Sequence, residues 1–498
     1  MIEKSARRRP ETVSAVPADQ LALSEALTFD DVLLVPQYSE IRPREADLST
    51  RLTKKIGLKI PVLSAAMDTV TEAEMAIKLA LHGGLGVIHK NNLAAEQASL
   101  VQQVKRFENG FIQNPVTLGP EDSLAQAHEI RTRLGYKKIP IVDQDGKFLG
   151  LLTEKDYFAS DGLTGLVKNH MRPKTGVHTR PISVTLKEAN EIIRRERIEV
   201  LPVLDREGRL TSIVTRSDLE KNEEYPNASK DERKRLRVGA AVGVGAEALT
   251  RAKLLAEAGV DVVAVDVAHG HSRGVAEMVS QLKQALPQVE VIGGNVASRA
   301  GAKLLASAGA DAVKVGVGPG SICSTRVVAG IGVPQLTAVQ EAVAGVRETG
   351  KDIPVIADGG IRSSGDIVKA LAAGAETVML GRLFAGTEEA PGLLESVGEH
   401  RYKVYRGMGS YEAMSQGSGD RYGHDQQSSS EVSAEGVVGR VPYAGSMVPR
   451  LKELLGGIRA GCAYNGAKHL GDLPARAQFV KITGAGLQES HPHSISRE

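Results

Sequence analysis

One cysteine of the sequence lies where a thiol could do chemistry. Cys323 belongs to the segment GVGPGSICSTR, residues 316–326, directly after an apolar run that predicts a buried strand. Three glycines allow this segment to approach a ligand closely, and neighbouring backbone amides or Arg326 could favour the reactive thiolate. The residue types alone fit either a nucleophile or a small residue in a loop. Cys462, in GGIRAGCAYNG, has no comparable setting.

The elements that would position this loop are short runs rich in Val, Ile and Ala, each followed by a turn and a stretch of helical periodicity. We expect eight strands, at residues 60–67, 84–89, 238–243, 261–268, 289–296, 312–318, 353–360 and 377–382. Most start 23–28 residues apart, enough for a strand and a crossover helix. Near-continuous apolar strands indicate a parallel sheet covered on both faces. The sequence therefore predicts an α/β fold, a (β/α)8 barrel, with Cys323 at the strand ends where barrel enzymes act.

Two intervals between these strands are longer than one unit needs. The interval of 41 residues holds the cysteine loop, and the interval of 154 residues has room for a further domain. Within the longer one, KIPIVDQDGKFLGLLTEKDY aligns with VLPVLDREGRLTSIVTRSDL, which lies 62 positions later. A strand, turn, strand and helix repeated in this way form a tandem supersecondary unit.

These intervals give the expected domain boundaries. The barrel is expected from residues 1–112 and 226–498, and the insert from residues 113–225. The insert divides into repeats at 113–165 and 166–225.

The composition excludes several classes of protein. There are 62 Lys and Arg against 60 Asp and Glu, a formal net charge of +2, so no obligatory nucleic-acid partner held by bulk charge is expected. Two cysteines exclude a disulfide framework and favour a reducing compartment. The basic N-terminus is not followed by the apolar run of a secretory signal, and no run approaches the ~20 residues that span a bilayer. We expect a soluble, cytoplasmic protein with no membrane partner.

A dinucleotide-binding fingerprint is imitated at one point. GVGAEA, residues 243–248, matches G-x-G-x-x-A after a strand, and Asp266 follows at a suitable distance. Because the regular succession of strands and helices continues through this segment, we expect it to be an ordinary strand-to-helix turn of the barrel. We do not expect it to be the phosphate-binding turn of a Rossmann fold.

The repeat in the insert resembles a pair of CBS modules, in which a Thr-x-x-Asp element contacts a nucleotide ribose. In this sequence the element falls on Thr153 with Asp156 and on Thr215 with Asp218. The resemblance implies a regulatory site for an adenine or guanine nucleotide. The structural alternative is that each threonine caps the helix that follows it.

The cysteine loop and seven other segments resemble the inosine-5′-monophosphate dehydrogenase family over essentially the whole chain. The other segments are LTFDDVLLVP, SAAMDTVTE, DVAHGHS, GGN, ADGGIR, YRGMGS and GAGLQESH. The resemblance implies that Cys323 attacks C2 of the purine of IMP. A hydride then passes to NAD⁺, and water hydrolyses the thioimidate to XMP, which is covalent catalysis by an activated thiol.

The same resemblance assigns the site residues. Catalytic roles fall on Cys323, Thr325, Arg421, Tyr422 and Glu435. IMP is expected to contact Ser321, Asp358, Gly359, Gly360, Gly381, Arg382, Tyr405, Gly407, Met408, Gly409 and Glu435. NAD is expected to contact Asp266, Asn295, Gly316 and Gly318. A K⁺ ion is expected at Gly318, Gly320 and Cys323 and, from a neighbouring subunit, at Glu489, Ser490 and His491. This last site implies a homotetramer, which could pair into an octamer.

Two features leave alternatives open. Arg382 stands where the family usually has Ser, and it could bind phosphate or point away from it. The polar stretch at about 410–439 carries Arg421, Tyr422 and Glu435 and is either a functional lid or a linker. The rival activities are GMP reductase, which shares the barrel and the cysteine loop, and a nucleotide-sensing regulatory protein with an inactive barrel.

Overall fold

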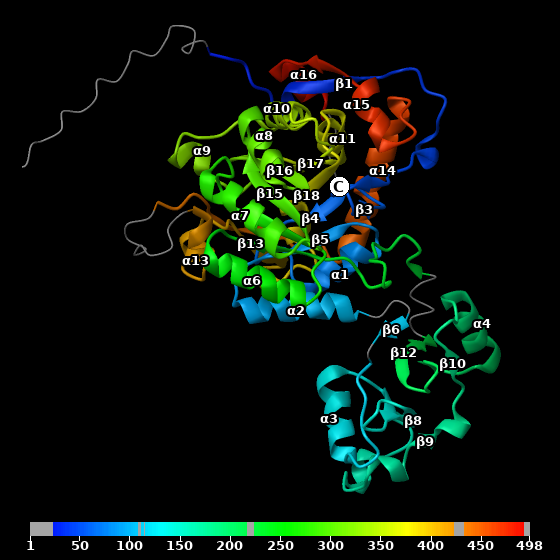
Figure 1. Ribbon diagram of the computed structural model, residues 1–498. Coiled ribbons are helices and arrows are strands. Elements are labelled where there is room, and N and C mark those ends of the chain that lie inside the picture. Colours follow the sequence, from blue (N-terminus) through cyan, green and yellow to red (C-terminus); the bar gives the residue numbers. More distant parts are fainter. Residues whose placement is uncertain (1–22, 108–110, 114, 217–223, 423–432, 493–498) are drawn as a thin grey trace, which may run out of the picture.

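The apolar runs form a closed barrel of eight parallel strands in this computed structural model, which describes residues 23–107, 111–113, 115–216, 224–422 and 433–492 (Figure 1). The strands are, in barrel order, β13 (Gly239–Val242), β14 (Val262–Asp266), β15 (Glu290–Val296), β16 (Ala312–Val315), β17 (Val355–Asp358), β18 (Thr377–Leu380), β4 (Val62–Ser64) and β5 (Leu85–Ile88). Each lies within one of the eight predicted runs. The prediction of a (β/α)8 barrel is confirmed.

The inside of the barrel is filled by side chains that alternate along the strands, as the pleat requires. Leu63, Ile292 and Ile356 are completely buried there. The hairpin of β2 (Thr50–Arg51) and β3 (Gly57–Leu58) closes the N-terminal end of the barrel with further apolar side chains. Each such side chain stabilises the fold by about 1.5–3 kcal/mol. The barrel is therefore a packed core and not a channel.

Helices surround the barrel and cover the outer faces of the strands. Those that follow the strands are α1 (Ala73–Leu81), α2 (Ala94–Arg106), α6 (Ala246–Glu257), α7 (Arg273–Ala285), α8 (Arg299–Ala308), α10 (Gln335–Arg347), α11 (Ser364–Ala372) and α12 (Arg382–Ala385). In α7 the buried residues Val275, Met278, Val279 and Leu282 are three or four positions apart, so they share the face that packs on the strands. The segment GVGAEA joins β13 to α6 within the barrel, as expected.

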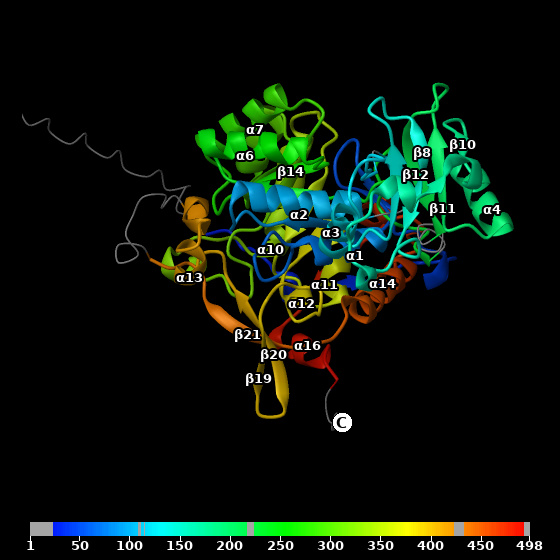
Figure 2. The ribbon, with the colours of Figure 1, turned by 90° about the horizontal axis from the view of Figure 1, so that it is seen from below.

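Further elements lie outside the eight units. They are β1 (Val32–Val35), which pairs with β22 (Gln478–Lys481), a sheet of β19 (Leu394–Val397), β20 (His400–Arg406) and β21 (Val438–Pro442), and the helices α9 (Thr325–Val328), α13 (Tyr411–Met414), α14 (Met447–Tyr464), α15 (Leu473–Arg476) and α16 (Gly484–Glu489). The β19–β20–β21 sheet projects from the body of the chain (Figure 2). No helix in the described ranges is long and apolar enough to cross a membrane.

The insert between α2 and β13 is built from two similar halves. The first contains α3 (Leu124–Leu134), β7 (Lys138–Val142) and β8 (Phe148–Thr153), and the second contains α4 (Leu186–Glu196), β11 (Val200–Leu204) and β12 (Leu210–Thr215). Corresponding elements start 62 positions apart, the spacing of the sequence repeat. The short strands β6 (Phe111–Gln113), β9 (Arg172–Pro173) and β10 (Arg180–Pro181) extend the two sheets. Apolar side chains of both halves, among them Phe148 and Ile213, share one buried cluster.

One buried lysine ties the two stems of the insert to the barrel. Lys105, near the end of α2, donates from Nζ to Asp231 at 3.1 Å and to Asp261 at 2.7 Å. It also donates to the carbonyl of Leu236 at 2.9 Å. The stem that leaves the barrel and the stem that returns are thus held together independently of the insert.

Candidate active site

The cysteine loop follows β16 and is joined to a segment more than a hundred residues later. Cys323 is half-buried, and its Sγ lies 3.2 Å from Oγ1 of Thr325. Thr325 in turn donates to Oε2 of Glu435 at 2.7 Å. The carbonyl of Glu435 accepts the amide of Ser324 at 2.9 Å, and Cys323 pairs with Gly436 as an isolated bridge. This arrangement can carry a proton between a group at the thiol and the Glu435 carboxylate.

Arg326 is placed differently from the sequence-based suggestion that it favours the thiolate. It donates from Nη2 to the carbonyl of Val333 at 2.7 Å and packs against Gly318 and Gly332. Its described contacts thus hold the loop after Cys323 and not the thiol.

A buried lysine near the cysteine loop is a candidate site residue that the sequence analysis did not name. The Lys314 side chain on β16 is 1 % exposed, and its Nζ donates to Asp266 at 3.0 Å, to Asp358 at 2.6 Å and to Oδ1 of Asn295. The three donors of the ammonium are therefore matched by three oxygens. Asn295 also donates from Nδ2 to Asp358 at 2.9 Å. Lys314 thus joins the ends of β14, β15 and β17 into one charged network.

The first part of the polar stretch at about 410–439, called the flap from here on, lies against this network. Arg421, in the 3-10 helix η7 (Ser418–Tyr422), forms an ion pair with Asp266, and its carbonyl accepts the amide of Ala268 at 3.1 Å. Burial alone would raise the pKa of Asp266, but Arg421 and Lys314 outweigh it and hold that pKa below its usual value. Tyr422 ends η7; its side chain and residues 423–432 lie outside the described part of the chain.

The residues predicted for IMP lie on the side of β17, β18 and β20. Tyr405 is buried, and its hydroxyl is hydrogen-bonded to Ser321. Burial raises the pKa of Tyr405 to about 12, so the hydroxyl remains a donor at neutral pH. A Cβ added to Gly381 would lie 2.9 Å from that hydroxyl, so only glycine leaves this space free. Gly359 and Gly360 adopt φ values of +89° and +77° at the end of β17.

The segment after Tyr405 forms the remaining wall of the site. Met408 is buried, and its carbonyl accepts the hydroxyl of Ser418 at 2.6 Å. Gly407 donates its amide to Val437 at 2.9 Å, and a Cβ added to Gly407 would lie 2.9 Å from the carbonyl of Ile322. The cysteine loop, the Met408 segment and both described arms of the flap are therefore in direct contact.

These residues line one pocket of about 130 Å³. Of the predicted residues it includes Cys323, Glu435, Arg421, Asp266, Asn295, Gly316, Gly318, Gly320, Asp358, Gly359, Tyr405, Gly407 and Met408. Among the described residues, Ser321, Thr325, Gly360, Gly381, Arg382 and Gly409 are not part of its wall. Residues of the wall that were not predicted include Lys314, Met67 and Met379. Lys314 had a signal, since it is a lysine within the otherwise apolar strand AVKV.

This pocket, at the C-terminal ends of the barrel strands, can be compared with known proteins. The family model described as "IMP dehydrogenase / GMP reductase domain" matches residues 26–493. The chain belongs to the IMP dehydrogenase / GMP reductase family.

Relatives in this family are similar to the chain over nearly its whole length. It is 53 % identical to the inosine-5′-monophosphate dehydrogenase of Aquifex aeolicus, over 95 % of this chain and 96 % of the relative. It is 50 % identical to that of Halalkalibacterium halodurans over the same shares. Among solved structures, a GMP reductase variant of Trypanosoma brucei in complex with guanosine 5′-monophosphate has a TM-score of 0.87 and 38 % identity, covering 96 % of this chain and all of that one.

The remaining predicted residues of this family member lie outside the pocket. Arg382 is exposed at the start of α12, and its charge offsets only a small part of the rise in the pKa of Tyr405 that burial causes. Glu489, Ser490 and His491 are exposed at the end of α16. In the insert, Asp156 accepts from the amide and the hydroxyl of Thr153 at 2.6 and 2.7 Å.

The second Thr-x-x-Asp element is described only in part. Thr215 is buried at the end of β12, whereas Asp218 lies outside the described residues.

Proposed function

We propose that the chain is an IMP dehydrogenase that oxidises IMP to XMP with NAD⁺, through a covalent bond between Cys323 and C2 of the purine. The chain of contacts from Cys323 through Thr325 to Glu435 carries this proposal. It supplies a nucleophile, together with a path by which a proton can leave an attacking water.

The pocket residues fit the two nucleotides on opposite sides of Lys314. On the β17 side, the Asp358 carboxylate can accept a ribose diol of IMP, and the Tyr405 hydroxyl can donate to its phosphate. On the β14 side, Asp266 and Asn295 offer polar groups for the ribose of the nicotinamide. Bound NAD⁺ would supply the hydride acceptor.

The flap supports a second, hydrolytic step at the same thiol. Arg421 and the ribose of NAD would both be partners of Asp266, so they exclude one another. While Arg421 is paired with Asp266, Thr325 contacts Cys323 and is hydrogen-bonded to Glu435. These two residues could then take a proton from the water that attacks C2. Displacement of the thiolate from C2 then releases XMP and restores the free cysteine.

An absorbance assay tests the activity. IMP with NAD⁺ should produce NADH, and Cys323→Ala should abolish this. Cys462→Ala is the matched control, because Cys462 is free and buried in α14, outside the pocket wall. If GMP with NADPH is consumed instead, the chain is a GMP reductase. If neither pair reacts, the regulatory alternative gains support.

We also propose that the insert is a CBS pair that binds a regulatory nucleotide. A pocket of about 290 Å³ between its halves is lined by residues of both, and many of the lining side chains are basic: Lys137, Lys138, Lys155, Arg172, His178 and Arg197. Thr153 lies in the same wall. Cations around a hydroxyl suit the phosphates and ribose of a nucleotide. The solved GMP reductase of Trypanosoma brucei in complex with guanosine 5′-triphosphate is 36 % identical to the chain, with a TM-score of 0.77.

Thermal unfolding tests the nucleotide site. ATP or GTP should raise the midpoint of the chain, and Lys155→Ala with Arg172→Ala should remove this response. Lys187→Ala is the matched control, since Lys187 is exposed on α4 and does not line the pocket. Deletion of residues 113–225 should leave NADH formation largely intact. An unchanged response in the double variant would contradict this site.

We propose that a K⁺ ion and neighbouring subunits complete the catalytic loop. The K⁺ ligands would be carbonyl oxygens of Gly318, Gly320 and Cys323, because oxygen cages of this kind suit monovalent cations. Exposure of residues 489–491 is what donation to another copy requires. Large exposed side chains just after the cysteine loop, Val327 at 88 % and Ile331 at 59 %, support burial between copies. Mass photometry should detect a tetramer or octamer, and K⁺ should stimulate turnover more than Na⁺.

A further inference from the structure

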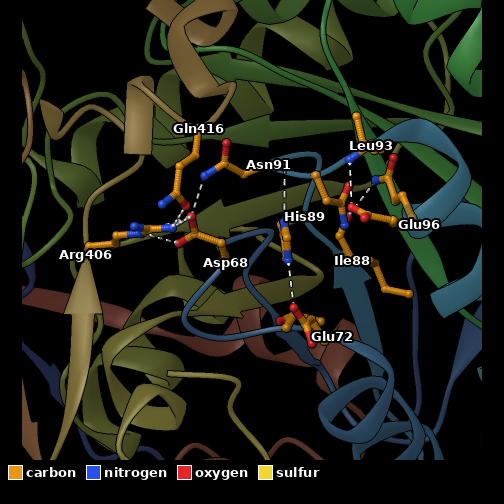
Figure 3. Close-up of polar contacts among 12 residues, drawn as sticks. Asp68, Glu72, Ile88, His89, Asn91, Leu93, Glu96, Arg406 and Gln416 are labelled. Atoms are coloured by element: carbon orange, nitrogen blue, oxygen red, sulfur yellow. Dashed lines mark hydrogen bonds and ion pairs between the residues drawn. The ribbon is translucent and has the colours of Figure 1, made fainter. Parts of the chain in front are cut away.

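A cluster of polar side chains joins the base of the flap to the barrel next to the pocket (Figure 3). Asp68, in the loop after β4, accepts from Nε and Nη2 of Arg406 at 3.0 and 2.6 Å. It also accepts from Nδ2 of Asn91, in the loop after β5, at 2.5 Å. Arg406 donates from the same Nη2 to Oε1 of Gln416 at 2.6 Å. Asp68 thus joins Asn91 to Arg406, and Arg406 in turn joins this carboxylate to Gln416.

Burial makes the centre of this cluster stiff. The side chain of Asp68 is 5 % exposed and that of Arg406 is 18 % exposed. The guanidinium contacts the carboxylate through two nitrogens, which fixes direction as well as distance. Arg406 also donates its amide to Oγ1 of Thr69 at 3.3 Å, so its backbone is attached to the same loop. The ion pair can therefore hold the start of the flap in one position relative to the barrel.

The sequence neighbours of the cluster belong to the pocket. Met67 precedes Asp68, and Tyr405 and Gly407 flank Arg406; all three line the pocket wall. The ion pair therefore sets the position of the strand end that carries Tyr405 and of the segment that continues to Met408.

Gln416 connects the same ion pair to the start of the flap. Gly417 follows with φ +124°, and a Cβ added there would lie 3.4 Å from Oδ1 of Asn91. Ser418 is next and is bonded to the carbonyl of Met408, and Arg421 on Asp266 ends this run. The segment from Gln416 to Arg421 is thus attached at its beginning, near its middle and at its end.

We propose that Arg406, held by Asp68, is a positioning residue that anchors the docked flap through Gln416, and so places Arg421 for the hydrolytic step. This rests on the proposed function. Arg406 and Gln416 act through other residues and not on the reacting atoms. Loss of Gln416 should therefore affect hydrolysis, which needs the docked flap, and spare the earlier transfer of hydride, during which Arg421 has left Asp266.

Two substitutions of Gln416 test this proposal in opposite directions. Gln416→Leu removes the acceptor for Arg406. It should lower steady-state turnover about threefold to tenfold, the change expected from one lost hydrogen bond, while the first-turnover burst of NADH keeps its rate. Gln416→Glu places a carboxylate on the guanidinium and strengthens the bond. It should raise the KM for NAD⁺, because a better-anchored flap competes more strongly at Asp266. Gln284→Leu is the matched control, an exposed glutamine on α7.

Amide hydrogen exchange of residues 416–422 gives a readout that does not depend on activity. Exchange should be faster than wild type in Gln416→Leu, slower in Gln416→Glu, and unchanged in Gln284→Leu. Equal exchange in all variants would overturn the anchor, and so would a burst slowed as much as the steady state. A wild-type chain that forms no NADH from IMP would instead contradict the proposed function, and the exchange result would still decide the anchor.

Discussion

Replacement of Lys314 by Met tests whether one buried cation serves both nucleotide sides of the pocket. In the network, the positive charges of Lys314 and Arg421 balance the negative charges of Asp266 and Asp358. Lys314→Met removes one positive charge and leaves these four positions with a net charge of −1. Removal of one partner of a buried ion pair costs about 3–5 kcal/mol. Here Asp266 keeps Arg421 and Asp358 keeps Asn295, so we expect the free energy of unfolding to fall by the lower end of this range, about 3 kcal/mol.

The assay measures kcat/KM for IMP and for NAD⁺ separately, with thermal unfolding alongside. Lys314→Met should lower both values, whereas Asp358→Asn should mainly lower that for IMP and Asp266→Asn that for NAD⁺. Lys314→Arg should not restore activity, because the ammonium is enclosed by three oxygens in a side chain that is 1 % exposed, and the larger planar guanidinium does not fit that space. A Lys314→Met enzyme with wild-type values for both substrates, or impaired for one alone, would refute the reasoning.

The same substitution changes the acid limb of the pH profile. Lys314 and Arg421 hold the pKa of Asp266 below its usual value, so the ionised form persists as the pH falls. With one cation removed that pKa rises, and loss of kcat/KM for NAD⁺ on acidification should begin at a higher pH than in the wild type. Coincident acid limbs would contradict the assignment.

Three further predictions concern the remaining pocket residues. Glu435→Gln should slow steady-state turnover by about a hundredfold while the NADH burst survives, because the proton path ends at this carboxylate; stopped-flow absorbance separates the two. Arg382→Ser should change the KM for IMP by less than about threefold, since Arg382 is exposed and does not belong to the pocket wall, and a larger rise would assign it to phosphate. The KM for IMP should show no titration of Tyr405 between about pH 8 and 10, because burial raises its pKa to about 12 and the hydroxyl stays protonated; a step in this range would be evidence against it.

The barrel could be predicted from sequence because its signal is local and repeated. Each strand is a short apolar run followed by a helix, and the count of eight such units predicts a closed barrel and not an open sheet. Strand ends were predicted too long: residues 316–318, assigned to the sixth strand, follow β16, which ends at Val315. Gly316 has φ +152°, and its Cα lies so close to the carbonyl oxygen of Asp358 that an added Cβ would be 2.0 Å from it. The sequence does not reveal this close approach of two strand ends.

The site was predicted as a set of residues, but its internal contacts were not. Resemblance named Asp266 and Arg421 for different roles, and the structure pairs them with each other. Sequence analysis does not assign a role to Lys314, because a single lysine only interrupts an otherwise apolar strand. Its two carboxylate partners, Asp266 and Asp358, lie on other strands and become its neighbours only when the barrel closes. Contacts of this kind depend on which strand ends become neighbours, which periodicity does not specify.

The ammonium of Lys105 has a consequence for how such a chain can evolve. It closes the gap between α2 and β13 with contacts that belong to the barrel alone, so the barrel does not need whatever is threaded through that gap. Helices of the barrel run opposite to its strands, so this gap opens at the N-terminal face, at the far end from Cys323. The insert at this gap can therefore be exchanged or removed without a change in the residues around Cys323. Any signal from it must reach the pocket along the barrel or through a neighbouring copy.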